Sequence, residues 1–130
     1  MPRMSLAERR AKEQEQLVQH QRQEWAEFKA SYPRRLLNLV YEFSRWPELS
    51  VRKDADRDSF VFSRPRHMND KWFPVELPEE YNFEFIYALQ EAEQAVESLI
   101  QAEKEAERLY QLRQRALSKL SDEERQALNL

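Results

Sequence analysis

The sequence predicts a mainly α-helical fold: a long antiparallel helical hairpin, coiled-coil-like, with a small antiparallel β-hairpin or three-stranded meander inserted at the bend and a short C-terminal helix. Apolar residues recur at intervals of three and four on both sides of the centre, which is the period of a helix. Between residues 49 and 77 apolar and polar residues alternate instead, which is the period of a strand. Two helical segments of nearly equal length joined by a short insert most simply fold back as a hairpin.

At 130 residues the chain is expected to form a single domain over residues 1–130. We predict a kinked helix at 5–46, a β-insert at 47–77, a long helix at 78–120 and a short tail helix at 121–130. The mean hydropathy is −0.94 and the N-terminus lacks an apolar leader, so we expect a cytoplasmic protein without contact to a membrane.

The first helix has a clear start and an interruption. Ser5 and Glu8 have the spacing of a capping box, in which each side chain bonds a free backbone amide of the other residue. A heptad row follows through Ala7, Ala11, Gln14, Val18, Gln21, Trp25, Phe28 and Tyr32. Pro33 interrupts this row, and because proline cannot donate a helical hydrogen bond we predict a kink or short break there.

The β-insert is predicted from two alternating runs. Leu49, Val51 and Lys53 form the first run, and Phe60, Phe62 and Arg64 form the second. The polar residues 54–58 between them form the turn of a hairpin, and 72–75 could add a third strand. Pro65 and Pro74 favour edge positions, because proline cannot donate to a ladder.

The second long helix is predicted to open at Pro78, since proline and acidic residues are favoured in a first turn. From residue 78 to residue 120 it would extend about 65 Å at 1.5 Å per residue. Ser121 and Glu124 form a second capping box, which predicts the tail helix. The layout of helix, β-insert and helix resembles that of prefoldin subunits, a likeness of arrangement that no residue motif accompanies and that implies no function.

Apolar side chains beside the helical rows exceed what a two-helix hairpin can bury. Leu17, Ile86, Ile100, Leu109 and Leu112 fall next to the rows rather than in them. Small domains often cover such surface by self-association. We therefore predict a homo-oligomer, a dimer or a tetramer.

The composition argues against catalysis. The chain has no glycine and no cysteine, so it lacks phosphate-binding loops, nucleophile elbows and thiolate metal sites. Asp54, Asp56 and Asp58 have the spacing of the opening of a calcium loop, but Ser59 and Pro65 stand where that loop needs glycine and glutamate. We expect no enzyme, no cofactor and no metal.

Charge is unevenly spread along the chain. Residues 1–46 hold nine Lys/Arg against six Asp/Glu, whereas residues 76–130 hold six against thirteen. In the β-insert basic and aromatic residues are interleaved, as in proteins that stack bases on aromatic rings and hold phosphates with cations. The candidate nucleic-acid-binding residues are the cations Arg52, Lys53, Arg64, Arg66 and Lys71 and the stacking residues Trp46 and Trp72.

The β-insert aromatics have another interpretation, because Phe60 and Phe62 on one strand face can pack beneath the helices as core. Two functions remain open from the sequence. One is an oligomeric, single-stranded nucleic-acid-binding accessory factor for transcription or replication. The alternative is a coiled-coil adaptor or inhibitor that binds a protein partner.

Overall fold

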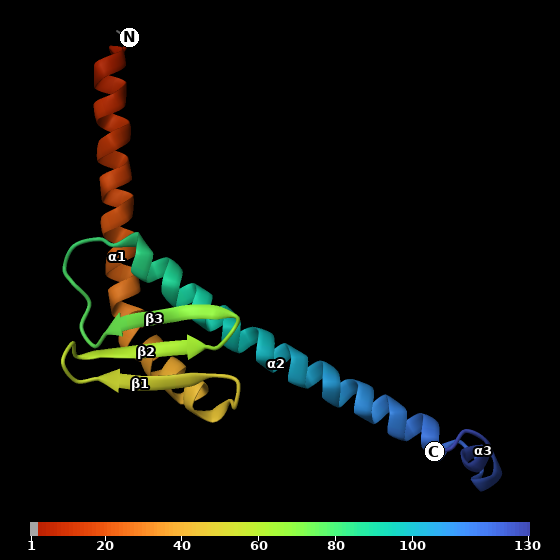
Figure 1. Ribbon diagram of the computed structural model, residues 1–130. Coiled ribbons are helices and arrows are strands. Elements are labelled where there is room, and N and C mark those ends of the chain that lie inside the picture. The colour runs from red at the N-terminus through yellow and green to blue at the C-terminus, as the bar shows by residue number, and fades with distance from the viewer. Residues whose placement is uncertain (1–2) are drawn as a thin grey trace. The chain divides into compact units, whose positions relative to one another are not determined.

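The computed structural model describes residues 3–130 and confirms a mainly helical chain with a sheet between its long helices (Figure 1). The elements in order are α1 (Leu6–Arg45), β1 (Ser50–Asp54), β2 (Ser59–Arg64), β3 (Met68–Pro74), α2 (Phe83–Ser118) and α3 (Asp122–Ala127). The chain divides within α2 into two compact units, Met1–Glu93 and Gln94–Leu130.

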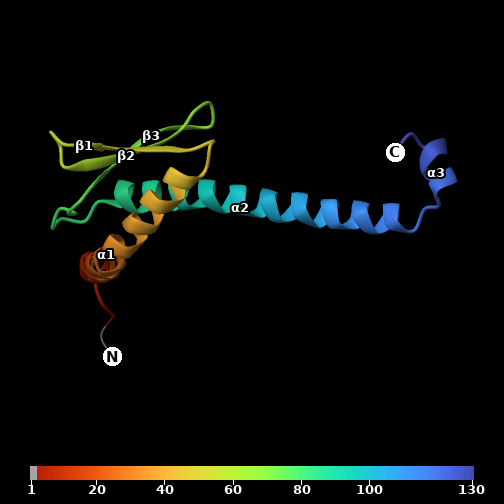
Figure 2. The same cartoon turned by 90° about the horizontal axis from the view of Figure 1, so that it is seen from below.

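Helix α1 starts as the capping box predicts, with Ser5 Oγ accepting from the Glu8 amide at 3.1 Å. The helix then continues through Pro33 without a break. In Figure 2 the N-terminal part of α1 is seen end-on while its C-terminal part runs across the view, so the helix axis bends. The carbonyl of Lys29, which Pro33 cannot bond, belongs to an exposed residue that water can reach.

Only the second half of α1 contributes to the core. Residues 6–20 are all exposed, so the first positions of the predicted heptad row are uncovered. The buried side chains follow one stripe of the helix, Trp25, Phe28, Tyr32, Leu36, Leu39 and Phe43.

The sheet is a three-stranded antiparallel meander in the order β1-β2-β3, which confirms the hairpin and the presence of a third strand. The third strand begins at Met68, earlier than the predicted range of 72–75. Phe62 pairs with Val51 on one side, and its neighbour Phe60 pairs with Phe73 on the other. Pro74 ends the edge strand β3, where its missing amide costs no ladder bond, and Pro65 lies in the turn before that strand.

One face of the sheet is fixed to α1 by aromatic packing. The ring of Phe62 meets Phe43 of α1 edge-on at 5.0 Å and Phe73 of β3 edge-on at 5.5 Å between centroids. Phe62 and Phe73 are both 0% exposed. The Tyr32 hydroxyl also donates a hydrogen bond to the Pro74 carbonyl, which ties α1 to β3. The core interpretation of the strand phenylalanines is therefore correct for Phe62.

Helix α2 begins at Phe83, so the predicted start at Pro78 is wrong. The helix starts later because Asn82 caps its N-terminus: Asn82 Oδ1 accepts a hydrogen bond from the Glu84 amide at 3.0 Å. Within the first unit, the start of α2 buries Ile86, Leu89 and Ala92.

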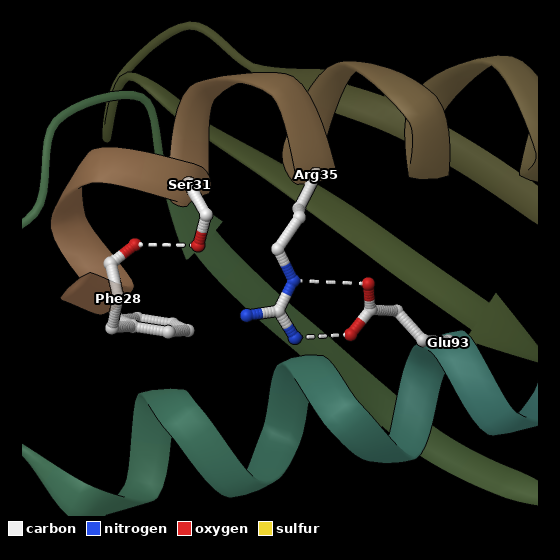
Figure 3. A network of polar contacts seen from close by, with 4 residues as sticks. All are labelled: Phe28, Ser31, Arg35 and Glu93. Atoms are coloured by element: carbon white, nitrogen blue, oxygen red, sulfur yellow. Dashed lines mark hydrogen bonds and ion pairs between the residues drawn. The ribbon is translucent and has the colours of Figure 1, made fainter. Parts of the chain in front are cut away.

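A polar network joins α1 to the start of α2 (Figure 3). The Arg35 guanidinium reaches from α1 to the Glu93 carboxylate, where Nε donates to Oε2 at 3.0 Å and Nη2 donates to Oε1. The same guanidinium lies 5.5 Å from the centroid of the Phe28 ring. Ser31 Oγ donates to the Phe28 carbonyl at 3.2 Å, one turn before Arg35. Such two-pronged pairs fix orientation as well as distance.

The second unit contains the rest of α2 and helix α3. Ser121 and Glu124 form the predicted capping box, and Arg125 donates two hydrogen bonds to the Leu117 carbonyl, at 3.2 and 2.7 Å. The Leu117 carbonyl also accepts from the Leu120 amide at 3.2 Å, so Arg125 adds to a backbone bond at the end of α2 and holds α3 against it. Every residue from 101 to 116 is exposed.

The aromatic packing predicts a large cost for truncating its central ring. Phe62→Ala should lower the free energy of unfolding by about 3–5 kcal/mol, because it removes buried surface and leaves a cavity. The matched control is Phe83→Ala, where the ring is 57% exposed and the loss should stay within about 0.5 kcal/mol. Urea unfolding followed by circular dichroism measures both, and equal losses would contradict the assigned core.

Candidate functional site

The strand register separates the residues of the sheet into two faces. Directly paired residues of antiparallel strands share a face, and Arg52, Val61 and Trp72 form one such row across β1, β2 and β3. Phe62 belongs to the opposite face, which packs on α1. The row with Trp72 therefore lies on the face turned away from α1, here called the outer face.

Trp72 is the centre of a small group on the outer face. The guanidinium of Arg52 lies 5.4 Å from its ring centroid, and that of Arg57 lies 4.8 Å from it. Val61 beside the ring is only 1% exposed, whereas Trp72 itself remains 37% exposed. We call these residues, Arg52, Arg57, Val61 and Trp72, the outer cluster. Cations within about 6 Å of an indole face are attracted by its ring electrons.

Arg57 is not among the residues expected from the sequence. It lies in the turn at residues 55–58, and Asp58 in that turn has a φ of 45°. The Val75 amide donates to the Asp58 carbonyl at 3.0 Å, which holds the turn beside the end of β3. In the sequence, Arg57 is marked only as a basic residue within an acidic turn. Its approach to Trp72 depends on how β1, β2 and β3 pair, which the local sequence does not reveal.

Three of the expected cations lie on the side of the sheet that faces the helices. Lys53 is 3.8 Å from Asp58, and Lys71 is 2.7 Å from Glu91 of α2, so both charges have acidic partners. The Nε atom of Arg64 is buried without a hydrogen-bond partner among the described residues. These cations therefore do not join Arg52 in one basic surface.

The remaining two expected residues are at the margins of the sheet. Arg66 is exposed in the turn before β3. Its φ of 72° is a backbone conformation that is uncommon for a residue with a long side chain. Trp46 caps the end of α1, where its Nε1 donates to Glu42 Oε2 at 2.9 Å and Arg45 lies over its ring at 5.0 Å. Thus the structure brings Arg52 and Trp72 together and leaves the other expected residues apart.

Two hollows of different polarity are described within the first unit. A groove of about 590 Å³ runs between α1 and the segment before α2, with Trp25 and Tyr81 among its lining residues. Loss of solvation and the nearby Glu24 carboxylate raise the pKa of Tyr81. A more polar hollow of about 420 Å³ is lined by residues 66–69 together with Lys71 and Glu91. Neither hollow gathers a set of side chains with an evident reaction.

Across residues 3–130, no three His, Asp or Glu side chains come together as a metal site would require. No helix of the described chain is long and apolar enough to cross a membrane. No family model, curated protein or solved structure matches this chain. A function must therefore be inferred from the chain's own surfaces.

Proposed function

We propose that this chain is a non-enzymatic binding protein that works as a homo-oligomer, a dimer or a tetramer, joined through coiled-coil-like helix contacts. The observation that supports this proposal is the apolar surface left uncovered on the long helices. Exposed large apolar residues on these helices include Leu6, Leu17, Val18, Leu37 and Tyr41 of α1 and Phe83, Tyr87, Leu109, Tyr110 and Leu112 of α2.

Some of these residues differ from scattered surface leucines because they fall in pairs at helical spacing, such as Leu37 with Tyr41 and Phe83 with Tyr87. Leu109 and Leu112 are 53% and 45% exposed and lie within one turn of each other. A second helix laid along this surface would remove both from water, at about 25 cal/mol for each Å² of apolar area. Recurring apolar positions along exposed helices are typical of surfaces that pair with other helices.

Sedimentation equilibrium of the wild-type protein tests this proposal. We expect a mass above the 15.8 kDa of one chain at micromolar concentration. A single species of one chain's mass at the highest soluble concentration would contradict the proposal. The same helix surfaces would then be those a protein partner covers, as in a coiled-coil adaptor or inhibitor.

The outer cluster supports a second candidate function, binding of single-stranded nucleic acid as an accessory factor for transcription or replication. Trp72 presents part of its ring to solvent, and Arg52 and Arg57 supply cations at that ring. Stacking of one base on such a ring contributes about 1–3 kcal/mol to the binding free energy, while arginines bind the adjacent phosphates. Asp54 shares a strand with Arg52 and reduces the positive charge there, so we expect weak binding without sequence preference.

Fluorescence anisotropy of a labelled single-stranded oligonucleotide tests the second candidate. Binding should weaken as salt rises, and Arg52→Ala with Arg57→Ala should reduce the slope of log affinity against log salt by about 0.7 for each phosphate that is no longer neutralised. The control is Lys53→Ala, next to Arg52 on the same strand but on the opposite face and beside Asp58. Absence of binding at low salt, or an equal effect of the control, would refute a site at the outer cluster.

A further inference from the structure

The exposed part of α2 carries a regular row of its own. Leu99, Ala102, Ala106, Leu109, Arg113 and Ala116 follow one another at alternating intervals of three and four residues, the heptad spacing of a helix seam. We call these residues the α2 seam. From residue 101 onward its members are exposed, and Leu109 is 53% exposed. In proteins most of the stability of a helix comes from packing of one of its faces, so a partner for the seam would stabilise this part of α2.

The seam alternates large and small side chains in a way that fits a second copy of itself. If two α2 seams run antiparallel, Leu99 of one copy can face Ala116 of the other, and Ala106 can face Leu109. Large residues then meet alanines in each layer, the arrangement that fills space without voids. Arg113 faces Ala102 in the same register, where its aliphatic stem can pack and its guanidinium can reach solvent.

Charge gives the same register independently. Residues 97–107 carry Glu97, Glu103, Glu105 and Glu107 against the single base Lys104. Residues 108–119 carry Arg108, Arg113, Arg115 and Lys119 and no acid. The register that matches large with small residues places its twofold axis between residues 107 and 108, where the acidic half meets the basic half. Each acidic half therefore lies along the basic half of the other copy.

A parallel pair would lose both advantages. It would set Arg113 against Arg113 in the seam and lay acidic halves beside acidic halves, and like charges at such distances repel. It would also align the two helix dipoles, whereas an antiparallel pair opposes them.

We propose that residues 99–116 of α2 pair antiparallel with the same residues of a second copy, with the twofold axis between residues 107 and 108. The proposal rests on the proposed function, because it names the surface through which the oligomer forms. The alternative to this dimer is an unpaired α2 stabilised by hydrogen bonds between its own side chains. Examples are Gln101 with Glu97 at 2.7 Å and Gln111 with Glu107 at 2.9 Å.

Disulfide trapping tests the pairing directly, because the chain contains no cysteine of its own. Leu99→Cys and Ala116→Cys proteins of different tag length are mixed, equilibrated and mildly oxidised. An antiparallel pair predicts a mixed disulfide between the two variants and little Leu99→Cys homodimer, since those sulfurs would be about 25 Å apart along the helices. Gln114→Cys, an exposed position near Ala116 but outside the seam, serves as the control partner and should form much less mixed disulfide with Leu99→Cys.

Each other outcome overturns the pairing in a distinguishable way. Predominant Leu99→Cys homodimer would show parallel helices, and no disulfide in a protein that sediments as an oligomer would place the interface elsewhere. In both cases the proposed oligomer stands while this inference fails. A wild-type protein that sediments as one chain would refute both.

A charge reversal provides a second readout that does not depend on cysteine chemistry. Arg113→Glu places an acid opposite the acidic half of the other copy and should raise the dissociation constant of the oligomer roughly tenfold or more. Arg115→Glu changes charge equally on the side of the helix away from the seam and should have a much smaller effect. Similar effects of the two variants by sedimentation would overturn the assigned seam.

Discussion

The packing of the sheet against α1 through Phe43, Phe62 and Phe73 is the contact on which the first unit depends. A three-stranded sheet cannot bury a face by itself, and these rings cover one face with the last turns of α1. The sheet follows α1 after a short connection, so the position of the helix end fixes the position of β1. Because one face of the sheet is used in this way, the outer face is the face of the sheet that is left for a ligand.

The early part of α1 and the later part of α2 are exposed, each within its own unit. Residues 6–20 of α1 are exposed, whereas the sheet packs against the part of α1 that ends with Phe43, and residues 101–116 of α2 are exposed. Within Gln94–Leu130, α3 contacts the end of α2 through Arg125 and Leu117. We propose a second copy as the partner of the exposed part of α2, and the order of charges along α2 supports that proposal.

Much of the fold follows from local signals that act over a few residues. The capping boxes at Ser5 and Ser121 predict helix starts, and alternation at Phe60 and Phe62 predicts strands, because each depends on neighbouring residues only. The start of α2 is predicted too early because Pro78 and Asn82 are competing signals, and the amide bond that Asn82 accepts decides between them. At Pro33 a kink or a short break is predicted; α1 bends but is not broken (Figure 2), since Lys29, whose carbonyl loses its helical partner, is an exposed residue that water can reach.

The site is less predictable than the fold. Arg52 and Lys53 are adjacent on a strand, so their side chains point to opposite faces, and the alternation alone separates them. The pairing of Lys71 with Glu91 joins the sheet to α2, and the approach of Arg57 to Trp72 spans two strands. Neither contact has a local signal, because each depends on how distant segments pack.

Amide hydrogen exchange across a dilution series tests most directly whether a second copy covers α2. Exchange of residues 99–116 should become faster as the protein is diluted, while β2, which is held within one chain, should keep its protection at all concentrations. Exchange in residues 99–116 that is the same at every concentration would show that this part of α2 has no partner copy, and it would contradict self-association through this helix.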